Sequence, residues 1–295
     1  MRDPAWADRG QMLQFDLDDS PRPPACVGLS RMGGVRVTGG ACSIWMVVRG
    51  HVWVDCKEGR FRLRRGEWML FERDSNPVLQ SSEHGLGLGV LLTTPDLHAL
   101  EQLSDSVLYP GRGRFASHDR CVALRLWRTA KDGRESEALR PILLHMARAQ
   151  RDLAERVQLC PGRSRSRKRQ VFGRMQRARL YLEGHSDRVV RIGELADMTN
   201  FSSWYFSKAF QSLYDESPQA LSARLRLERA ADLLRSTEMT VSEVAASCGF
   251  DNCCSFARAF RARFGTSATR YRASQPRGSG PVGSLSRPAP RSTAV

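Results

Sequence analysis

The stretch VSEVAASCGFDNCCSFARAFRARF, residues 241–264, decides how the C-terminal half of this chain folds. The apolar residues expected on its buried side are Val241, Val244, Ala245, Phe250, Phe256 and Phe260. Cys248-Gly249 breaks the first helical run, and Asn252 is a good N-cap for a second helix. A short helix, a glycine-containing turn and a second helix with a basic outer face predict a helix-turn-helix.

The same apolar frame occurs a second time upstream. Ile192, Leu195, Ala196 and Phe201 precede Val241, Val244, Ala245 and Phe250 by 49 residues, and Phe206 and Phe210 precede Phe256 and Phe260 by 50. One residue is therefore added in the second turn. A duplicated helix-turn-helix, at residues 192–213 and 241–264, arises by chance far less readily than a single one.

A third helix is expected between the two repeats. Ser217-Pro218 is a helix-start signal, with proline at the first helical position, and the helical pattern continues to Arg235. Such a helix is roughly 27 Å long. With the offsets of the recognition helices added, the two repeats would lie about one DNA turn apart, roughly 34 Å. We therefore expect the recognition helices to enter successive major grooves of double-stranded DNA.

Residues 171–272 resemble the DNA-binding domain of the AraC/XylS family of transcriptional regulators. The resemblance rests on IGELADMTNFSSWYFSKAF, SPQALSARLRLERAADLL, TVSEVAASCGFDNCCSFARAFRARFG and the closing Tyr271-Arg272. It implies DNA contacts by Ser203, Trp204, Ser207, Lys208 and Gln211 in the first repeat, and by Asn252, Cys253, Cys254, Ala257, Arg258 and Arg261 in the second.

The chain departs from the family pattern at three places. Asp215 and Ala268 replace a usual glycine and a usual proline, and Cys253-Cys254 occupies positions that are often polar. We therefore expect the second helix to read few bases, except through Arg258, which can bind guanine with two hydrogen bonds. The two thiols form either a redox switch at the DNA surface or a tolerant surface of small residues, and the second interpretation is favoured.

Charge supports a polyanionic partner for the C-terminal part. The net charge is +15, and residues 161–273 carry 20 basic against 11 acidic residues, while residues 1–160 carry 23 against 20. Salt-dependent phosphate contacts are expected from Lys208, Arg258 and Arg261, joined by Arg224 and Arg226 on the intervening helix. An arginine-rich composition alone also raises the charge of many proteins.

The N-terminal part has a different pattern. Between Val27 and Thr93, short runs rich in Val, Trp, Phe and Leu are punctuated by glycine, and 52–56 with 61–63 read as a hairpin. The pattern then becomes helical, with candidates at 96–109, 120–130 and 135–159. We expect an α+β chain of two domains, with a cupin-like β-barrel or sandwich plus helices at 27–159 and an all-α double helix-turn-helix at 170–273.

The remaining segments read as connections. Residues 1–26 are expected to be a flexible arm, 160–169 (CPGRSRSRKR) a basic linker, and 274–295 a disordered tail. The long stretch 135–159 either packs on the β domain or pairs with a second copy of the chain. The 27–159 domain is therefore assigned to sensing or dimerisation.

A cupin-like domain raises the question of a cofactor. Metal-binding cupins supply a His-x-His pair and a later histidine, whereas His51 and His84 stand alone here. We expect no metal and no cofactor, and a small organic effector in any pocket of this domain. The tryptophans Trp45, Trp53 and Trp68 are expected mostly in the core.

An enzymatic function has little support. The sequence shows no Ser/His/Asp set, no Cys/His set and no paired carboxylates in a recognisable motif. Gly85-x-Gly87-x-Gly89 is followed by a strand, so it fails as a phosphate-binding loop. Eight cysteines without a CxxC pair, no apolar leader and no apolar run long enough to span a membrane predict a reduced, cytoplasmic protein.

We therefore interpret the chain as a sequence-specific DNA-binding transcription regulator. The family leans towards activation, which would make RNA polymerase a partner. Two alternatives stay open. The N-terminal domain is a small-molecule-binding or enzymatic module with DNA binding secondary, or the regulator is controlled by a protein partner instead of a small ligand.

Overall fold

The computed structural model describes residues 5–18, 25–40, 42–93, 96–97, 107–132 and 136–274. It divides into two compact units. The first unit comprises residues up to His185 together with Val190–Leu221, and the second comprises Ser186–Val189 and the chain from Ser222 onwards.

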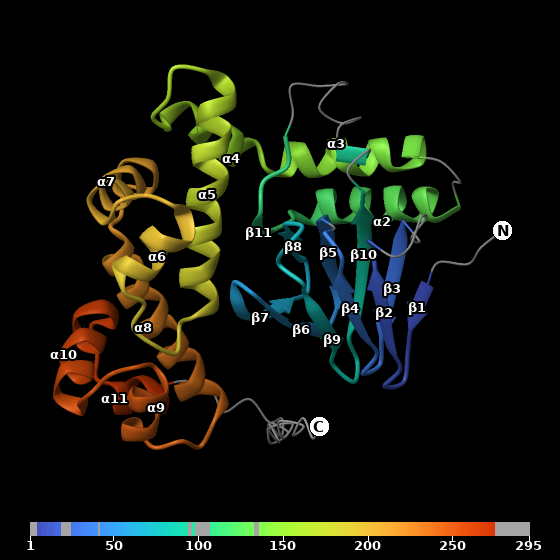
Figure 1. Ribbon diagram of the computed structural model, residues 1–295. Helices are drawn as coiled ribbons and strands as arrows, with labels where there is room; N and C mark the ends of the chain where they lie inside the picture. The colour runs from blue at the N-terminus through green and yellow to red at the C-terminus, as the bar shows by residue number, and fades with distance from the viewer. Residues whose placement is uncertain are drawn as a thin grey trace, which may run out of the picture. The chain divides into compact units, whose positions relative to one another are not determined.

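The N-terminal part of the first unit is built from two β-sheets (Figure 1). The six-stranded sheet has the order β1-β3-β10-β5-β8-β11, and its strands are β1 (Ala5–Ala7), β3 (Cys26–Ser30), β10 (Leu86–Leu92), β5 (Cys42–Arg49), β8 (Glu67–Phe71) and β11 (Gly111–Arg114). The five-stranded sheet has the order β2-β4-β9-β6-β7, and its strands are β2 (Met12–Asp16), β4 (Gly34–Thr38), β9 (Val78–Ser81), β6 (His51–Cys56) and β7 (Gly59–Arg64).

The hairpin expected from the alternation of residues 52–63 is confirmed as β6 and β7. Val52 lies opposite Leu63, and Val54 opposite Phe61, so the four buried side chains share the inner face of the sheet. Gly59 begins β7 with a φ of +118°, a conformation that favours glycine. The hairpin therefore has one apolar face in the core and one face carrying exposed, mostly charged residues.

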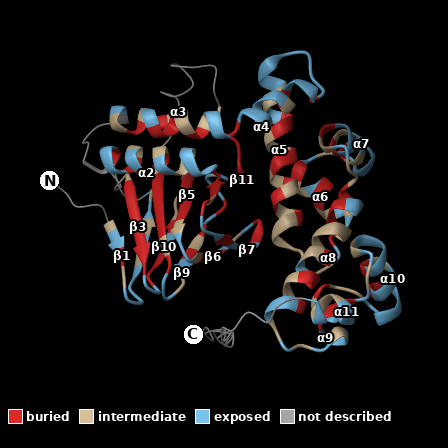
Figure 2. Cartoon of the chain, turned by 180° about the vertical axis from the view of Figure 1, so that it is seen from behind, coloured by how far each residue is buried: buried red, intermediate tan, exposed pale blue. Residues whose placement is uncertain are grey.

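Two apolar layers hold this domain together. Many of the strands that contribute to them are coloured as buried in Figure 2. The first layer lies between the two sheets and contains Trp45, Phe61, Leu63 and Phe71. The second lies on the other face of the six-stranded sheet, where Trp68 packs with residues of α2 (Ser117–Asp132) and α3 (Arg140–Ala149). The helices therefore cover one sheet, and the outer face of the other sheet is left to solvent.

The tryptophans differ in their surroundings. Trp45 and Trp68 are buried as expected, whereas Trp53 is 43% exposed on the outer face of β6. The long helix expected at 135–159 is divided into η1 (Ser136–Leu139), α3, α4 (Arg151–Arg156) and η2 (Val157–Leu159). Helix α3 ends at Ala149 and is followed by Gln150. The Gln150 side-chain amide accepts a hydrogen bond from Tyr109 N–H and donates one to Tyr109 C=O. The helix expected at 96–109 lies largely outside the described residues.

The expectation of a flexible arm over residues 1–26 is wrong for the described part of that segment. Strand β1 pairs in parallel with β3, and β2 pairs in parallel with β4. Trp6 donates a hydrogen bond to Ser30 Oγ at 3.0 Å, and Ser30 donates to Asp8. These strands are too short for a clear sequence signal, and they are fixed by pairing with distant strands.

The basic linker expected at 160–169 is also wrong in part. Helix α5 (Arg165–Gly184) begins inside it, because Ser164 caps the helix by accepting a hydrogen bond from Arg167 N–H. The boundary between compact units lies further along the chain, near Leu221. The first helix-turn-helix therefore belongs to the same unit as the β-sheets, contrary to the predicted division at the linker.

The remaining helices follow the predicted order. Their bounds are α6 (Ile192–Thr199), α7 (Ser203–Tyr214), α8 (Pro218–Ser236), α9 (Val241–Ser247), α10 (Cys253–Phe264) and α11 (Ala268–Ala273). The tail expected to be disordered, 274–295, lies outside the described residues except for Ser274, which ends α11. None of the helices in the described part of the chain is long and apolar enough to cross a membrane.

Candidate nucleic-acid interface

The first helix-turn-helix consists of α6 and α7, joined by a three-residue turn. Asn200 ends α6 with a φ of +53°, and Phe201 N–H then bonds Ala196 C=O at 3.0 Å. Ser202 caps α7 by accepting a hydrogen bond from Tyr205 N–H at 3.3 Å. Phe206 and Phe210 are fully buried, which fixes the rotation of α7 about its axis. The opposite face of α7 must then point to solvent.

That outer face carries the five predicted contact residues. Ser203, Trp204, Lys208 and Gln211 are exposed, and Ser207 is half-buried. Trp204 has 70% of its surface exposed, more than any of the other five tryptophans. The Lys208 ammonium lies 5.0 Å from the centre of the Trp204 ring, a cation–π contact. The structure therefore brings Trp204 and Lys208 together on one turn of the helix.

The second helix-turn-helix repeats this construction in α9 and α10. Thr240 and Glu243 form a capping box at the start of α9. Gly249 has a φ of +69°, and Phe250 N–H bonds Ala245 C=O at 3.1 Å, as Phe201 does 49 residues earlier. Asp251 is the added residue before Asn252, which caps α10. The duplicated frame inferred from the sequence is therefore seen in the backbone hydrogen bonds.

The outer face of α10 also carries the predicted residues. Phe256 and Phe260 are fully buried, while all six predicted contact residues are exposed: Asn252, Cys253, Cys254, Ala257, Arg258 and Arg261. Asn252 Oδ1 already accepts a hydrogen bond from Ser255 N–H at 2.8 Å. Cys253 Sγ lies 3.4 Å from Ser242 Oγ. The face thus presents two arginines among small groups.

The two arginines expected on α8 behave differently. Arg224 is half-buried and pairs with Glu228 at 3.1 Å. Arg226 donates a hydrogen bond to Gly249 C=O at 2.9 Å and stacks over the Phe250 ring at 4.6 Å. Its guanidinium therefore stabilises the turn of the second helix-turn-helix, and this internal role argues against a phosphate contact by Arg226.

Sequence reasoning missed the contribution of α5. Its Phe172 packs edge to face on Tyr109, and its Glu183 pairs with Arg112 at 2.9 Å, so α5 contacts the β-sheet region. Towards the first repeat, Arg174 donates a hydrogen bond to Thr199 C=O at 3.2 Å, and Gln176 accepts one from the Tyr214 hydroxyl at 2.5 Å. One helix therefore joins the sheets to the first helix-turn-helix.

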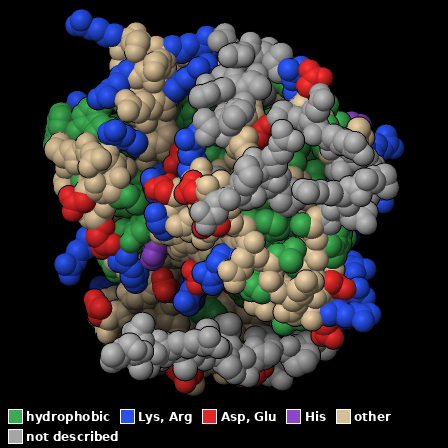
Figure 3. Space-filling view, turned by 45° about the vertical axis from the view of Figure 1, so that its right-hand side comes forward, with side chains coloured by type: hydrophobic (Ala, Val, Ile, Leu, Met, Phe, Trp, Pro, Cys, Tyr) green, Lys and Arg blue, Asp and Glu red, His purple; other side chains and the backbone are tan. Residues whose placement is uncertain are grey.

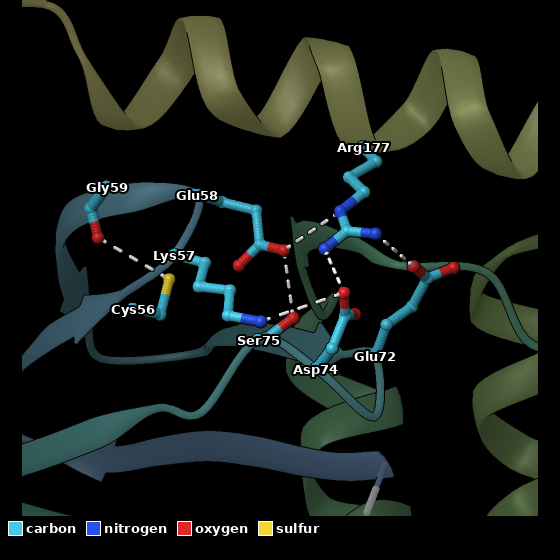
Figure 4. Close-up of polar contacts among 8 residues, drawn as sticks. All are labelled: Cys56, Lys57, Glu58, Gly59, Glu72, Asp74, Ser75 and Arg177. Carbon is cyan, nitrogen blue, oxygen red and sulfur yellow. Dashed lines mark hydrogen bonds and ion pairs between the residues drawn. The ribbon is translucent and has the colours of Figure 1, made fainter. Parts of the chain in front are cut away.

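Arg177 is the centre of this junction (Figure 4). Its guanidinium approaches three carboxylates, Asp74 at 2.5 Å, Glu58 at 3.5 Å and Glu72 at 3.9 Å. Glu58 is buried and also accepts a hydrogen bond from the Ser75 hydroxyl. The Glu58–Arg177 pair is separated by more than a hundred residues in sequence, so no local pattern could have revealed it.

The charges at this junction are strongly perturbed. Burial raises the pKa of the Glu72 carboxyl to about 7, and the attraction of Arg177 opposes the shift without cancelling it. The pKa of Asp74 is lowered, because its hydrogen bond and ion pair with Arg177 outweigh the opposing effect of burial. A carboxyl that titrates near neutrality therefore lies where the β-sheets meet α5.

The described part of the chain offers no cluster of metal ligands. Across the described ranges, no group of three or more His, Cys, Asp or Glu residues is placed to hold a metal ion. Burial raises the pKa of Cys248 to about 11, so its thiol stays protonated.

Basic side chains are prominent on the surface. A space-filling view shows Lys and Arg side chains exposed at many places on one face of the molecule (Figure 3).

Comparison with known proteins points to the same part of the chain. Residues 195–274 match the family model described as a helix-turn-helix domain. The transcriptional regulators CdhR and GbdR of Pseudomonas aeruginosa are 33% and 34% identical over 107 and 97 residues, which is 36% and 33% of this chain and 30% and 26% of theirs. The matched segment thus spans about a third or less of each relative.

A solved structure gives a similar match. The crystal structure of a probable AraC family transcriptional regulator from Rhodopseudomonas palustris is 35% identical, with a TM-score of 0.32, and the match covers 34% of this chain and 94% of that one. The duplicated frame, the exposed outer faces and the match to the family model agree on one kind of domain. The C-terminal segment of this chain, residues 195–274, is a helix-turn-helix domain, and it resembles the domain of that AraC family regulator.

Proposed function

We propose that the chain is a sequence-specific DNA-binding transcription regulator that reads double-stranded DNA with α7 and α10. The outer face of α7 carries the proposal, because Trp204 is 70% exposed and lies against Lys208. A large indole left in solvent gains little for the fold, and a flat ring beside a cation suits the sugar-phosphate backbone or a thymine methyl group.

The two helices take different parts in this proposal. On α7, Ser203, Ser207 and Gln211 supply hydrogen-bonding groups for base edges, and Lys208 supplies charge for phosphate. On α10, Arg258 binds guanine or phosphate and Arg261 binds phosphate, while Cys253, Cys254 and Ala257 offer a close-fitting surface. The first repeat therefore supplies more of the base reading, and the second more of the backbone affinity.

We propose that the regulator acts in the cytoplasm and that its β-sheet domain controls DNA binding by sensing an effector. Its contacts with the first repeat through α5 and Arg177 support this role, because a ligand that shifts the sheets would strain the junction. A small effector or a second copy of the chain would act there. Activation, with RNA polymerase as the partner, is the proposed output.

The proposal is tested by selecting bound duplexes from a random DNA pool with the full chain. We expect an enriched site with two parts, centred about 10 base pairs apart, because each recognition helix enters one major groove. Replacing the part that is read by α7 should weaken binding more than replacing the other part. Absence of any enriched sequence at both low and moderate salt would contradict the proposal.

A further inference from the structure

A concavity on the N-terminal domain is lined by basic side chains. It has a volume of about 610 Å³ and opens broadly to solvent. Its lining residues are Gly50, His51, Arg62, Arg64, Arg65, Arg114 and Arg120. No acidic residue is among these described lining residues, although acidic residues are common elsewhere in this domain. The concavity has no part in the DNA-reading faces of α7 and α10.

The arginines converge from separate elements. Arg62 and Arg64 lie on the outer face of β7, and His51 is the cross-strand partner of Arg64 on β6. Arg65 lies in the turn before β8. Arg114 belongs to the edge strand β11, and Arg120 lies in the first turn of α2. A solvated charge run on one strand would not gather side chains from both sheets and a helix.

The backbone holds these elements in register. Gly66 closes the turn after Arg65 with a φ of +82°, and Phe115 N–H bonds Gly66 C=O at 2.9 Å. This bond ties the turn to the segment between β11 and α2. A Cβ atom on Gly66 would lie 3.4 Å from an Arg120 guanidinium nitrogen. The turn and the start of α2 are therefore packed closely enough to fix the wall of the concavity.

The charge balance of the concavity is strongly positive. The lining contributes five guanidinium groups. Glu67, next to the lining residue Arg65 in the chain, pairs with Arg114 at 2.9 Å and accepts a hydrogen bond from the backbone N–H of Arg64. The His51 ring is 3.4 Å from Arg62. Burial, together with the nearby charges of Arg62 and Arg64, lowers the pKa of His51, so the ring favours its neutral form.

An aromatic surface adjoins the basic groups. Trp53 is 43% exposed on the outer face of β6, opposite Arg62 in the sheet. The Arg62 guanidinium lies 5.0 Å from the centre of the Trp53 ring, and the His51 ring meets Trp53 edge-on at 5.5 Å. The concavity therefore combines charge for an anion with a flat ring beside it.

We propose that this concavity binds a small polyanion with two or more phosphate or carboxylate groups. Arginine forks bind such groups with paired, charge-assisted hydrogen bonds. Guanidinium groups that converge in a hollow suit a compact anion, whereas a nucleic acid backbone calls for cations spread along a track. That the bound anion is the effector rests on the proposed regulator function. That the concavity binds an anion does not depend on DNA binding.

The test is calorimetric titration of the full chain with pyrophosphate and, separately, with citrate, in about 150 mM salt, where exposed charges are largely screened. We expect saturable binding of one anion per chain. Arg64→Gln combined with Arg120→Gln should weaken it at least tenfold. Arg60→Gln is the matched control, because Arg60 is exposed on the same strand, pairs with Asp55 at 3.2 Å and does not line the concavity.

The outcomes separate the possible ligands. Binding of pyrophosphate but not citrate assigns phosphate chemistry, and the reverse assigns carboxylates. Failure of both anions to bind, or equal weakening by Arg60→Gln, would overturn the site. So would a double variant that binds both anions normally and loses only DNA binding, since the arginines would then serve nucleic acid. Normal DNA binding by a double variant that has lost anion binding leaves the proposed function intact.

Discussion

The two helix-turn-helix repeats share one backbone frame and differ in what they present to solvent. Both turns contain a left-handed residue, Asn200 in the first and Gly249 in the second, and both are closed by a phenylalanine N–H bond to the preceding helix. The first outer face carries a tryptophan, a lysine and hydrogen-bonding groups. The second carries two cysteines, an alanine and two arginines.

The frame and the outer surface of each repeat are therefore subject to separate constraints. The buried phenylalanines and the turn must be kept, because they fix the angle between the two helices of each repeat. Groups on the outer face touch little of the protein and are free to diverge. A duplicated fold can therefore assign base reading and backbone affinity to different copies.

The largest expected effect comes from the buried frame. Phe206→Ala and Phe256→Ala each empty a fully buried site, and each should cost about 4 kcal/mol of unfolding free energy. Because the repeats belong to different compact units, hydrogen exchange should quicken mainly in the unit that carries the change. Equal loss of protection in both units after either change would show that the repeats unfold as one body.

Arg177 belongs to the helix that connects the first repeat to the β-sheets, so changing it should affect the first repeat and not the second. Arg177→Met leaves the buried Glu58 carboxylate without its cation and should destabilise the first unit by about 3 kcal/mol. Chemical denaturation followed by hydrogen exchange measures the effect, which should spare the second repeat. The control Arg177→Met with Glu58→Gln should recover part of the loss, and no recovery would mean that Arg177 acts through Asp74 and Glu72 instead of Glu58.

The sequence predicted the repeats well and their setting less well. Local signals such as Asn252 before α10, Pro218 at the start of α8 and phenylalanines four residues apart specify helices, caps and buried faces. The strands Ala5–Ala7 and Met12–Asp16 depend on partners far along the chain, as does the Arg177 junction. Likewise Arg226 reads as a surface cation on its helix, and only the fold shows it holding the turn at Gly249.

The outer faces give a smaller expected effect on DNA affinity. Trp204→Ala should weaken binding to the selected duplex about tenfold, because a stacked or packed aromatic contributes about 1–3 kcal/mol. Cys254→Ser should change affinity less than about twofold, since a small exposed group is replaced by another of similar size. Fluorescence anisotropy measures both, and a larger loss from Cys254→Ser would reverse the roles assigned to the two repeats.

The smallest expected effect concerns pH at the junction of α5. The pKa of Glu72 is raised from 4.5 to about 7. As pH rises from 4.5 to 7, the unfolded chain loses this proton before the folded chain does, so the protonated carboxyl's contribution to stability is progressively lost. Glu72→Gln, which stays neutral, should therefore gain melting temperature relative to the parent chain across this window. A difference that is constant with pH would place the titration elsewhere.

The most direct measurement is the salt dependence of binding to the selected duplex. Lys208→Ala should weaken binding and reduce the slope of log affinity against log salt by about 0.9, because it removes one phosphate contact. Arg258→Ala should also weaken binding, with the same reduction in slope where Arg258 binds phosphate and with an unchanged slope where it binds guanine. Arg263→Ala is the control on α10, since Arg263 pairs with Glu228 at 3.2 Å, and its slope should match that of the parent chain. Unchanged affinity and slope for both Lys208→Ala and Arg258→Ala would contradict DNA binding through the two recognition helices.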